Sequence, residues 1–130
     1  MHKRYRVLIA DDDKFIRGQL TGIITKAGHS ANSAADSESA LKLIGQESFD
    51  VLITDIYMEK MSGQEMIKVV KKMKPDMPVI AMTGDETIDL EREVRGLGVF
   101  AYFLKPIEMD FMLKTLEAAF AICEKKQAGE

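Results

Sequence analysis

The sequence predicts an α/β fold in which helices cover both faces of a parallel β-sheet. Short segments rich in valine, isoleucine and leucine alternate with longer segments whose apolar residues recur every three or four positions. This alternation is typical of a parallel sheet, because each helix returns the chain to the edge at which the next strand begins. Right-handed crossovers then restrict the topology to a few arrangements.

The short apolar segments are expected to form five strands. We place these strands at residues 7–10, 29–34, 51–54, 78–82 and 99–104. Residues 7–10 are all apolar, as in a strand that is buried on both faces of a parallel sheet. The segment 29–34 has the weakest strand pattern of the five.

The longer segments are expected to form five amphipathic helices. We place these helices at residues 13–27, 36–45, 62–73, 86–97 and 108–125. Either Asp36 or Ser37 is expected to cap the second helix. Ser62 and Glu65 have the spacing of a capping box at the start of the third.

Length and composition indicate a single domain over residues 1–130, with a core at 5–124 and a frayed tail at 125–130. A net charge of −3 does not favour direct binding of nucleic acid. We expect no membrane span and no signal peptide, since every apolar run is short. The single Cys123 excludes an internal disulfide and an all-cysteine zinc site, so the expected location is cytoplasmic.

Polar side chains follow four of the expected strands. The three aspartates Asp11–Asp13 follow the first strand, Asp55 the third, Thr83 the fourth and Lys105 the fifth. The carboxyl ends of parallel strands meet at one edge of the sheet, which is where such folds place their sites. Converging carboxylates repel one another unless a cation lies between them. Oxygen ligands of this kind suit Mg²⁺ or Mn²⁺.

The same residues have the equipment for phosphoryl transfer. Asp55 is the natural nucleophile, because carboxylates form aspartyl-phosphates. A divalent cation, the Lys105 ammonium and the Thr83 hydroxyl would together neutralise and position the phosphoryl group, which is most of what this reaction requires.

Four segments resemble the signature segments of response-regulator receiver domains, the CheY-like family of two-component signalling systems. They are Leu8–Asp13, Asp55–Gly63, Met82–Gly84 and Tyr102–Pro106, and the resemblance extends over residues 5–124. It implies a flavodoxin-like, doubly wound sheet of five parallel strands in the order 2-1-3-4-5, with five helices.

The resemblance implies a metal site and a phosphoacceptor. Asp55 would accept the phosphoryl group and also bind Mg²⁺ or Mn²⁺. Asp12 would bind the metal directly, Asp11 largely through water, and Tyr57 through its backbone carbonyl. Where receivers usually have proline four residues after the phosphoacceptor, this chain has Glu59, which puts the rigidity of the loop and the metal affinity in question.

Further residues take roles by resemblance. Thr83 and Lys105 would contact the phosphoryl oxygens, and the bond between Lys105 and Pro106 would be cis. Thr83 and Tyr102 would form the switch that transmits phosphorylation to the surface. Tyr57 and Asp85 would tune the rate of dephosphorylation.

The implied function is that of a phosphorylation-activated signalling switch. A sensor histidine kinase or a phosphotransfer protein would donate the phosphoryl group in a Mg²⁺-dependent reaction. The face made by the fourth helix, fifth strand and fifth helix would then change and control a protein partner or an output domain outside this chain. Such a domain catalyses only its own phosphoryl transfer and dephosphorylation. A phosphorylation-dependent homodimer is compatible with this function.

Three alternatives share some of these features. A haloacid-dehalogenase-type hydrolase also uses aspartate and Mg²⁺, and Asp11 with Asp13 begins its motif, but Phe15 occupies the position of its Thr or Val. A flavodoxin-type carrier needs a phosphate-binding loop after the first strand, where three aspartates would repel phosphate. The third alternative is a receiver that acts only as an interaction module, for which Glu59 is the one indication.

Overall fold

The computed structural model describes residues 3–128 and contains one parallel sheet with five helices. The strands are β1 (Arg6–Ala10), β2 (Ser30–Ala34), β3 (Val51–Asp55), β4 (Val79–Thr83) and β5 (Ala101–Leu104). The helices are α1 (Lys14–Lys26), α2 (Ser37–Gln46), α3 (Gly63–Met73), α4 (Ile88–Arg95) and α5 (Met109–Ala128). The strand order is β2-β1-β3-β4-β5, which confirms the predicted fold class.

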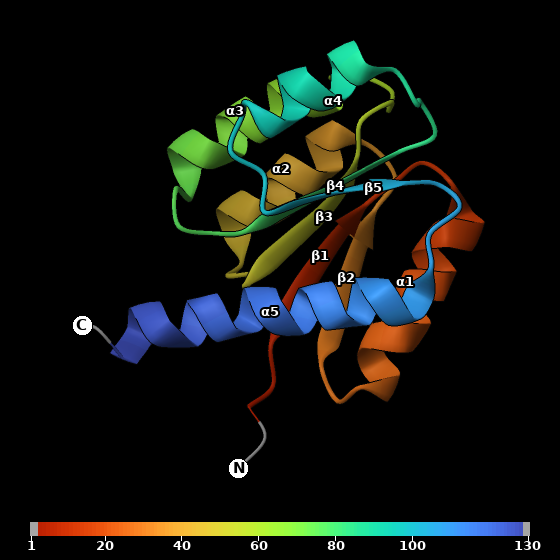
Figure 1. Cartoon of the computed structure of the whole chain (residues 1–130). Helices are drawn as coiled ribbons and strands as arrows, with labels where there is room; N and C mark the ends of the chain where they lie inside the picture. The colour runs from red at the N-terminus through yellow and green to blue at the C-terminus, as the bar shows by residue number, and fades with distance from the viewer. Residues whose placement is uncertain (1–2, 129–130) are drawn as a thin grey trace.

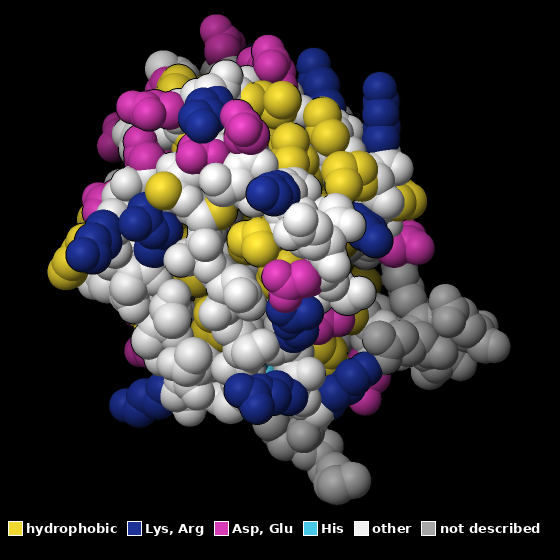
Figure 2. All heavy atoms as spheres, turned by 180° about the vertical axis from the view of Figure 1, so that it is seen from behind, with side chains coloured by type: hydrophobic (Ala, Val, Ile, Leu, Met, Phe, Trp, Pro, Cys, Tyr) yellow, Lys and Arg dark blue, Asp and Glu magenta, His cyan; other side chains and the backbone are white. Residues whose placement is uncertain are grey.

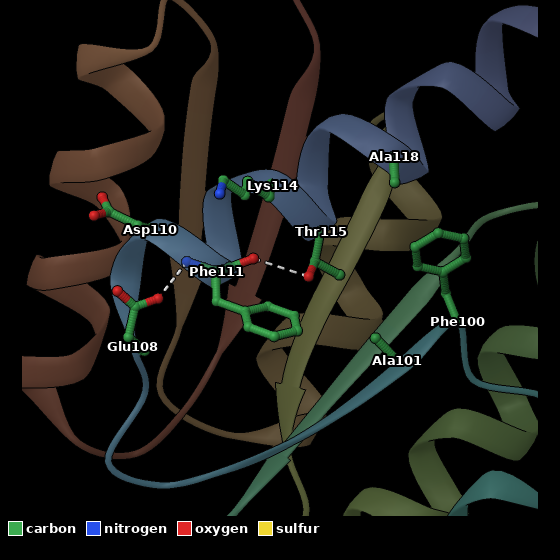
Figure 3. A pocket seen from close by; sticks show the side chains of 8 residues that line it. All are labelled: Phe100, Ala101, Glu108, Asp110, Phe111, Lys114, Thr115 and Ala118. Carbon is green, nitrogen blue, oxygen red and sulfur yellow. Dashed lines mark hydrogen bonds between the residues drawn. The ribbon is translucent and has the colours of Figure 1, made fainter.

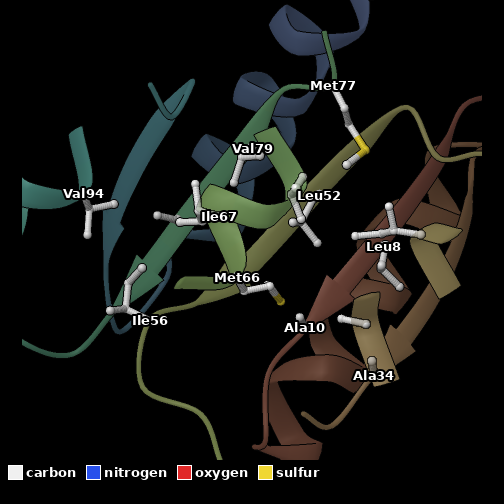
Figure 4. Close-up of a cluster of buried hydrophobic side chains, with 14 of the residues drawn as sticks. Leu8, Ala10, Ala34, Leu52, Ile56, Met66, Ile67, Met77, Val79 and Val94 are labelled. Atoms are coloured by element: carbon white, nitrogen blue, oxygen red, sulfur yellow. The ribbon is translucent and has the colours of Figure 1, made fainter. Parts of the chain in front are cut away.

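The sheet is covered on both faces (Figure 1). Helices α1 and α5 lie on one side of it, and α2, α3 and α4 lie on the other. Successive residues of a strand point to opposite faces, so each inner strand contributes to two cores. On β1, Leu8 and Ala10 pack under α2 and α3, whereas Val7 and Ile9 pack under α1 and α5. Figure 4 shows the first of these cores, in which Met66 and Ile67 of α3 face Leu52 and Val79. Burial on both sides explains why the inner strands are continuously apolar.

The register of the strands aligns their polar ends. Ala10 pairs with Thr54, Asp55 with Met82, and Thr83 with Leu104. The residues that follow β1, β4 and β5 therefore reach the same edge of the sheet as Asp55. This is the physical reason that distant segments of the sequence can form one site.

Local capping determines several helix ends. The Asp13 side chain accepts hydrogen bonds from the backbone N–H groups of Phe15 and Ile16, which caps α1. Of the two candidates for the cap of α2, Asp36 takes this place and accepts from the N–H of Ser39. Ser37 is instead the first residue of the helix, where its hydroxyl is available for other contacts.

Four predicted boundaries were wrong by two residues or more. Helix α4 begins two residues later than expected, because the Asp85 carboxylate holds the N–H of Thr87 in a turn, and it ends two residues earlier, at Arg95. At its other end the chain turns through Gly98, whose φ of 89° suits glycine, and β5 starts only at Ala101. Helix α5 continues to Ala128, so the tail expected from residue 125 is helical up to that point, and residues 129–130 lie outside the described part.

Within residues 3–128, no helix combines the length and the apolar composition needed to cross a membrane. Cys123 is half-buried on α5, as its place on the apolar stripe predicts, and its Sγ lies 3.5 Å from the backbone oxygen of Asp50.

Ile53, on the central strand, is fully buried and should be a main contributor to stability. Ile53→Ala is expected to lower the free energy of unfolding by about 2–5 kcal/mol, through lost apolar burial and the cavity it leaves. Ile88→Ala is the matched control, because Ile88 is 65% exposed and its truncation should change stability by less than about 0.5 kcal/mol. Urea unfolding measures both variants, and equal losses would contradict the assignment of Ile53 to the core.

Candidate functional site

Three carboxylates converge at the carboxyl edge of the sheet. Asp11 and Asp12 follow β1, Asp55 ends β3, and one carboxylate oxygen from each lies within 4.8 Å of the others. Asp11 and Asp55 are buried and Asp12 is exposed, so the cluster opens to solvent on the side of Asp12. The oxygen-only donor set and the concentrated negative charge fit a hard divalent cation such as Mg²⁺.

Lys105 joins two of these carboxylates. Its Nζ donates to Asp11 Oδ2 at 2.9 Å and to Asp55 Oδ2 at 3.0 Å. The other oxygens of the two carboxylates accept from backbone N–H groups, Asp11 Oδ1 from Asp13 at 2.8 Å and Asp55 Oδ1 from Tyr57 at 3.3 Å. Asp55 is thus held on both sides at the end of the central strand.

One ammonium group serves two buried carboxylates, and the pKa values reflect this imbalance. Burial raises the pKa of Asp55, and the hydrogen bond from Lys105 offsets only part of that rise while the nearby Asp11 charge adds to it. Burial by itself lowers the pKa of Lys105, but its hydrogen bonds to Asp11 and Asp55 raise it above the ordinary value. The site therefore keeps its ammonium charged and still has excess negative charge.

A hydrogen bond joins the loops that follow β3 and β4. The Tyr57 hydroxyl donates to Asp85 Oδ2 at 2.5 Å, and the backbone N–H of Asp85 donates to Oγ1 of the buried Thr83 at 3.1 Å. The hydrogen bond to Asp85 raises the pKa of Tyr57, and the same bond lowers the pKa of Asp85. The sequence indicated both residues as neighbours of the site, but their separation of 28 positions gave no sign that they would pair.

Tyr102 on β5 has an unusual environment. Among the described residues, its hydroxyl is the buried side-chain polar atom that has no hydrogen-bond partner. The ring packs against the core under α4, and the Arg95 guanidinium lies 5.5 Å from its centroid. Burial raises the pKa of the Tyr102 hydroxyl. A buried hydroxyl without a partner costs free energy.

The peptide bond between Lys105 and Pro106 is cis, as the resemblance implied. The family model described as "Response regulator receiver domain" matches residues 7–117. The chain belongs to this family.

Curated receivers and solved structures agree with this assignment. The chain is 34% identical over 113 residues to the DNA-binding transcriptional regulator NtrC of Proteus hauseri. These residues make up 87% of this chain and 24% of NtrC. It spans about a quarter of the length of the curated relatives it matches. The chemotaxis response regulator CheY4 of Vibrio cholerae is 28% identical, with a TM-score of 0.83 and coverage of 90% and 99% of the two chains. NtrX of Brucella abortus is 25% identical, with a TM-score of 0.89 over 98% of this chain and 30% of that one.

The receiver carries a hollow of about 670 Å³ on the side of β5 and the first turns of α5 (Figure 3). Its lining is mixed, and the residues are Phe100, Ala101, Glu108, Asp110, Phe111, Lys114, Thr115 and Ala118. Figure 3 shows the Phe111 ring beside Thr115, whose hydroxyl donates to the Phe111 backbone oxygen at 2.9 Å. Phe111 is 62% exposed and Leu104 is 45% exposed, so this face presents apolar side chains to solvent.

Charge is unevenly distributed over the receiver. Figure 2 shows Asp and Glu side chains gathered toward the upper left of the back view, with Lys and Arg more frequent below. Glu59, which takes the place of the usual proline, is exposed, so its charge is in contact with water rather than buried among the three carboxylates. Solvent screens such a charge, which reduces its expected effect on metal affinity.

The family assignment excludes two of the three alternatives that the sequence left open. The matched family is that of receivers, not of haloacid-dehalogenase-type hydrolases. A flavodoxin-type carrier would need a phosphate-binding loop, and the residues after β1 are instead the acidic cluster of a receiver.

Asp55→Asn is expected to raise the free energy of unfolding of the metal-free receiver at pH 7, because it removes a buried charge that Lys105 only partly compensates. The sign follows from linkage. The pKa of Asp55 is raised in the folded state. Its favourable contribution to the free energy of unfolding is therefore fully present below the unfolded-state pKa of about 4, and it is lost as pH rises through the folded-state pKa.

Urea unfolding in EDTA at pH 7 and at about pH 3.5 measures the difference in free energy of unfolding between Asp55→Asn and the unmodified chain. This difference should nearly vanish at the lower pH. Asp110→Asn, a substitution of an exposed carboxylate, is the control and should have little effect at either pH. A loss of stability for Asp55→Asn at pH 7 would show that the ion pair with Lys105 outweighs the repulsion.

Proposed function

We propose that this receiver is a phosphorylation-activated switch and that Asp55 is its phosphoacceptor. The observation that carries the proposal is the position of Asp55, which ends the central strand, contacts Lys105 and lies beside two further carboxylates. Lys105 bonds both Asp11 and Asp55, but Asp11 is completely buried whereas Asp55 keeps 5% of its surface exposed. Asp55 is therefore the carboxylate bonded to Lys105 that a phosphoryl donor can reach.

Asp12 and Asp55 would hold Mg²⁺ or Mn²⁺ directly, Asp11 would do so through water, and the Tyr57 backbone carbonyl would complete the protein ligands. When bound, the cation supplies charge neutralisation between the carboxylates and the phosphoryl oxygens. The excess negative charge supports this assignment, since three carboxylates with a single ammonium group lack two positive charges, which is the charge of one divalent cation.

The transfer itself needs few groups. An Asp55 carboxylate oxygen attacks phosphorus and forms the P–O bond of an acyl phosphate, while the bond from phosphorus to the donor's leaving group breaks. Lys105 already bonds the Asp55 carboxylate, so its ammonium group is placed to donate to a phosphoryl oxygen once the phosphoryl group is attached to Asp55. The Thr83 hydroxyl, whose oxygen accepts from Asp85, retains its own hydrogen for donation to the phosphoryl group.

The donor would be a sensor histidine kinase or a phosphotransfer protein, and the domain would catalyse only its own phosphorylation and dephosphorylation. A cytoplasmic location is part of the proposal, and the single cysteine, which forms no disulfide, supports it. The output would be a protein partner or an attached output domain, since the chain spans about a quarter of relatives such as NtrC.

The face formed by α4, β5 and α5 would carry the signal. It includes the exposed side chains of Ile88, Leu104 and Phe111, and the hollow of Figure 3. Apolar residues at this density on one face favour contact with another protein, either a partner or a second copy of the receiver.

Phosphorylation should occur at Asp55 and require a divalent cation. Incubation with Mg²⁺ and acetyl phosphate is expected to add one phosphoryl group by intact mass spectrometry, and Asp55→Asn should abolish the addition. Asp110→Asn serves as the control for the loss of a carboxylate. Undiminished labelling in excess EDTA, or of Asp55→Asn, would refute the assignment.

The bond between Tyr57 and Asp85 should prolong the life of the phosphoryl group, because it links the two loops beside Asp55 and limits the access of water. Tyr57→Ala and Asp85→Ala are each expected to increase the dephosphorylation rate about fivefold, the scale of one lost hydrogen bond. Tyr57→Phe, which keeps the ring, separates the hydroxyl from the bulk of the side chain. Unchanged rates in all three variants would show that these side chains do not control the path of water.

Phosphorylation should move Tyr102. A phosphoryl group on Asp55 would draw the Thr83 hydroxyl toward it, and the Tyr102 hydroxyl could then leave its unpaired position. Adding beryllofluoride, a mimic of the phosphoryl group, should shift NMR signals of Tyr102 and α4 more than those of α2. Asp55→Asn provides the control that cannot bind the mimic. If the mimic binds and α4 remains unchanged, the signal does not pass through Tyr102.

A further inference from the structure

The loop between β3 and α3, residues 56–62, is closed tightly at its base. The backbone N–H of Gly63 donates to the Ile56 carbonyl at 2.8 Å. A Cβ atom on Gly63 would lie 2.6 Å from the Ile56 Cα and 2.7 Å from the Asp55 carbonyl oxygen, so only glycine allows this approach. The loop includes Tyr57, whose carbonyl belongs to the proposed metal site. The base of the loop is therefore fixed, and the shape of the rest of the loop depends on what holds residues 59–61.

The opposite side contains a backbone conformation that is costly for a residue other than glycine. Lys60 has a φ of 77°, and the N–H of Met61 donates to the Glu59 carbonyl at 3.1 Å, which closes a three-residue γ-turn around Lys60. Such a turn persists only where its surroundings hold it. Glu59 has no ring to restrict its own φ, so the turn receives no support from the position at which receivers usually have proline.

The Ser37 hydroxyl binds both ends of this turn. Its oxygen lies 2.7 Å from the Met61 carbonyl oxygen and 3.1 Å from that of Glu59, and it accepts from the N–H of Met61 at 3.0 Å. A hydroxyl has one hydrogen, so this donation is a bifurcated hydrogen bond, stronger to the nearer Met61 carbonyl and weaker to the Glu59 carbonyl. One side chain thus satisfies three backbone atoms of a strained turn.

Ser37 is also well placed to act as an anchor. It is fully buried at the first position of α2, and the Asp36 side chain caps that helix by accepting from the N–H of Ser39 at 2.7 Å. A further polar contact between α2 and the loop is the ion pair of Lys60 with Glu38, at 3.6 Å, and both side chains are more than half exposed. Exposed pairs of this kind contribute little, whereas a buried hydroxyl that bonds backbone groups contributes more.

Met58 and Met61 add partly buried contacts with the core under α2 and α3. These contacts hold the loop against the protein, but flexible methionine side chains do not specify backbone dihedral angles. Directional bonds to the turn come from Ser37.

We propose that Ser37 is a positioning residue for phosphorylation, which keeps the β3–α3 loop in the shape that the metal site requires and takes over the role of the absent proline. The inference rests on the proposed function, since it concerns the loop that carries the Tyr57 carbonyl. Ser37 touches neither the carboxylates nor Lys105 in the contacts described, so its effect passes through the loop backbone.

The test compares the full chain with Ser37→Ala, Ser48→Ala, Glu59→Pro and the double variant Ser37→Ala with Glu59→Pro. Ser48 is the matched control, because it is exposed and its backbone carbonyl, rather than its hydroxyl, accepts the bond from Arg6. Two readouts need no phosphorylation: hydrogen exchange of the Met61 amide by NMR, and Mg²⁺ affinity from an NMR titration. The third is the rate of labelling by acetyl phosphate at low and at saturating Mg²⁺.

Ser37→Ala is expected to speed exchange of the Met61 amide and to weaken Mg²⁺ binding by about fivefold or more, as for the loss of a group that orients a metal ligand. Labelling should slow at low Mg²⁺ and recover when Mg²⁺ is saturating. Glu59→Pro should restore at least half of the lost affinity in the double variant, because it restricts the loop independently of the hydroxyl. Ser48→Ala should behave as the unmodified chain does.

Mg²⁺ affinity of Ser37→Ala within twofold of the unmodified chain would overturn the proposal. A loss of Mg²⁺ affinity that persists in the double variant with Glu59→Pro would also overturn it, because Ser37 would then have a general structural role rather than one in the loop. If Ser37→Ala unfolds too readily for titration, Ser37→Cys keeps the size with a much weaker donor and carries the same expectation. Failure of the unmodified chain to label at Asp55 would count against the proposed function, while the exchange and Mg²⁺ readouts would still decide the role of Ser37.

Discussion

The interaction on which the site depends is the sharing of Lys105 between Asp11 and Asp55. Two buried carboxylates at one edge of the sheet would repel each other and oppose folding if neither had a partner. The ammonium group bonds both and keeps them at fixed positions, yet it supplies a single positive charge. The site is therefore ordered and still short of positive charge, which a divalent cation would compensate.

Around this ion triad, side-chain hydrogen bonds join loops that the sheet leaves separate. Tyr57 bonds Asp85 across the loops after β3 and β4, and Ser37 ties the β3–α3 loop to the start of α2. The sheet positions the ends of strands, but it does not determine the shape of loops beyond them. In this receiver a few polar side chains with short, directional contacts hold that shape. The hydroxyl of Tyr102, which has no hydrogen-bond partner, lies on β5, the strand beside β4.

The residues of the candidate site were predictable because they end apolar strands. Asp55, Thr83 and Lys105 each follow such a segment, and a parallel sheet brings such ends to one edge whatever their separation in the sequence. The ends of α4 and β5 were less predictable, because they depend on one contact, from the N–H of Thr87 to Asp85, and on a turn through Gly98. Periodicity shows where an apolar face exists, but it does not show which turn competes for the residues at its margin.

The sequence by itself determined the class of fold, the strand ends that carry the chemistry, and the family to which four short segments pointed. These follow from local properties, namely apolar periodicity and polar residues at strand ends, which are readable without coordinates. Only the tertiary structure decided that Lys105 bonds Asp11 and Asp55 together, that Tyr57 meets Asp85, and that Ser37 supports the turn at Lys60. Ser37 had the pattern of a helix cap, whereas in the structure its hydroxyl bonds a loop 22 to 24 positions away. Contacts over such distances depend on how helices and loops pack above the sheet, and local sequence patterns carry no information about that packing.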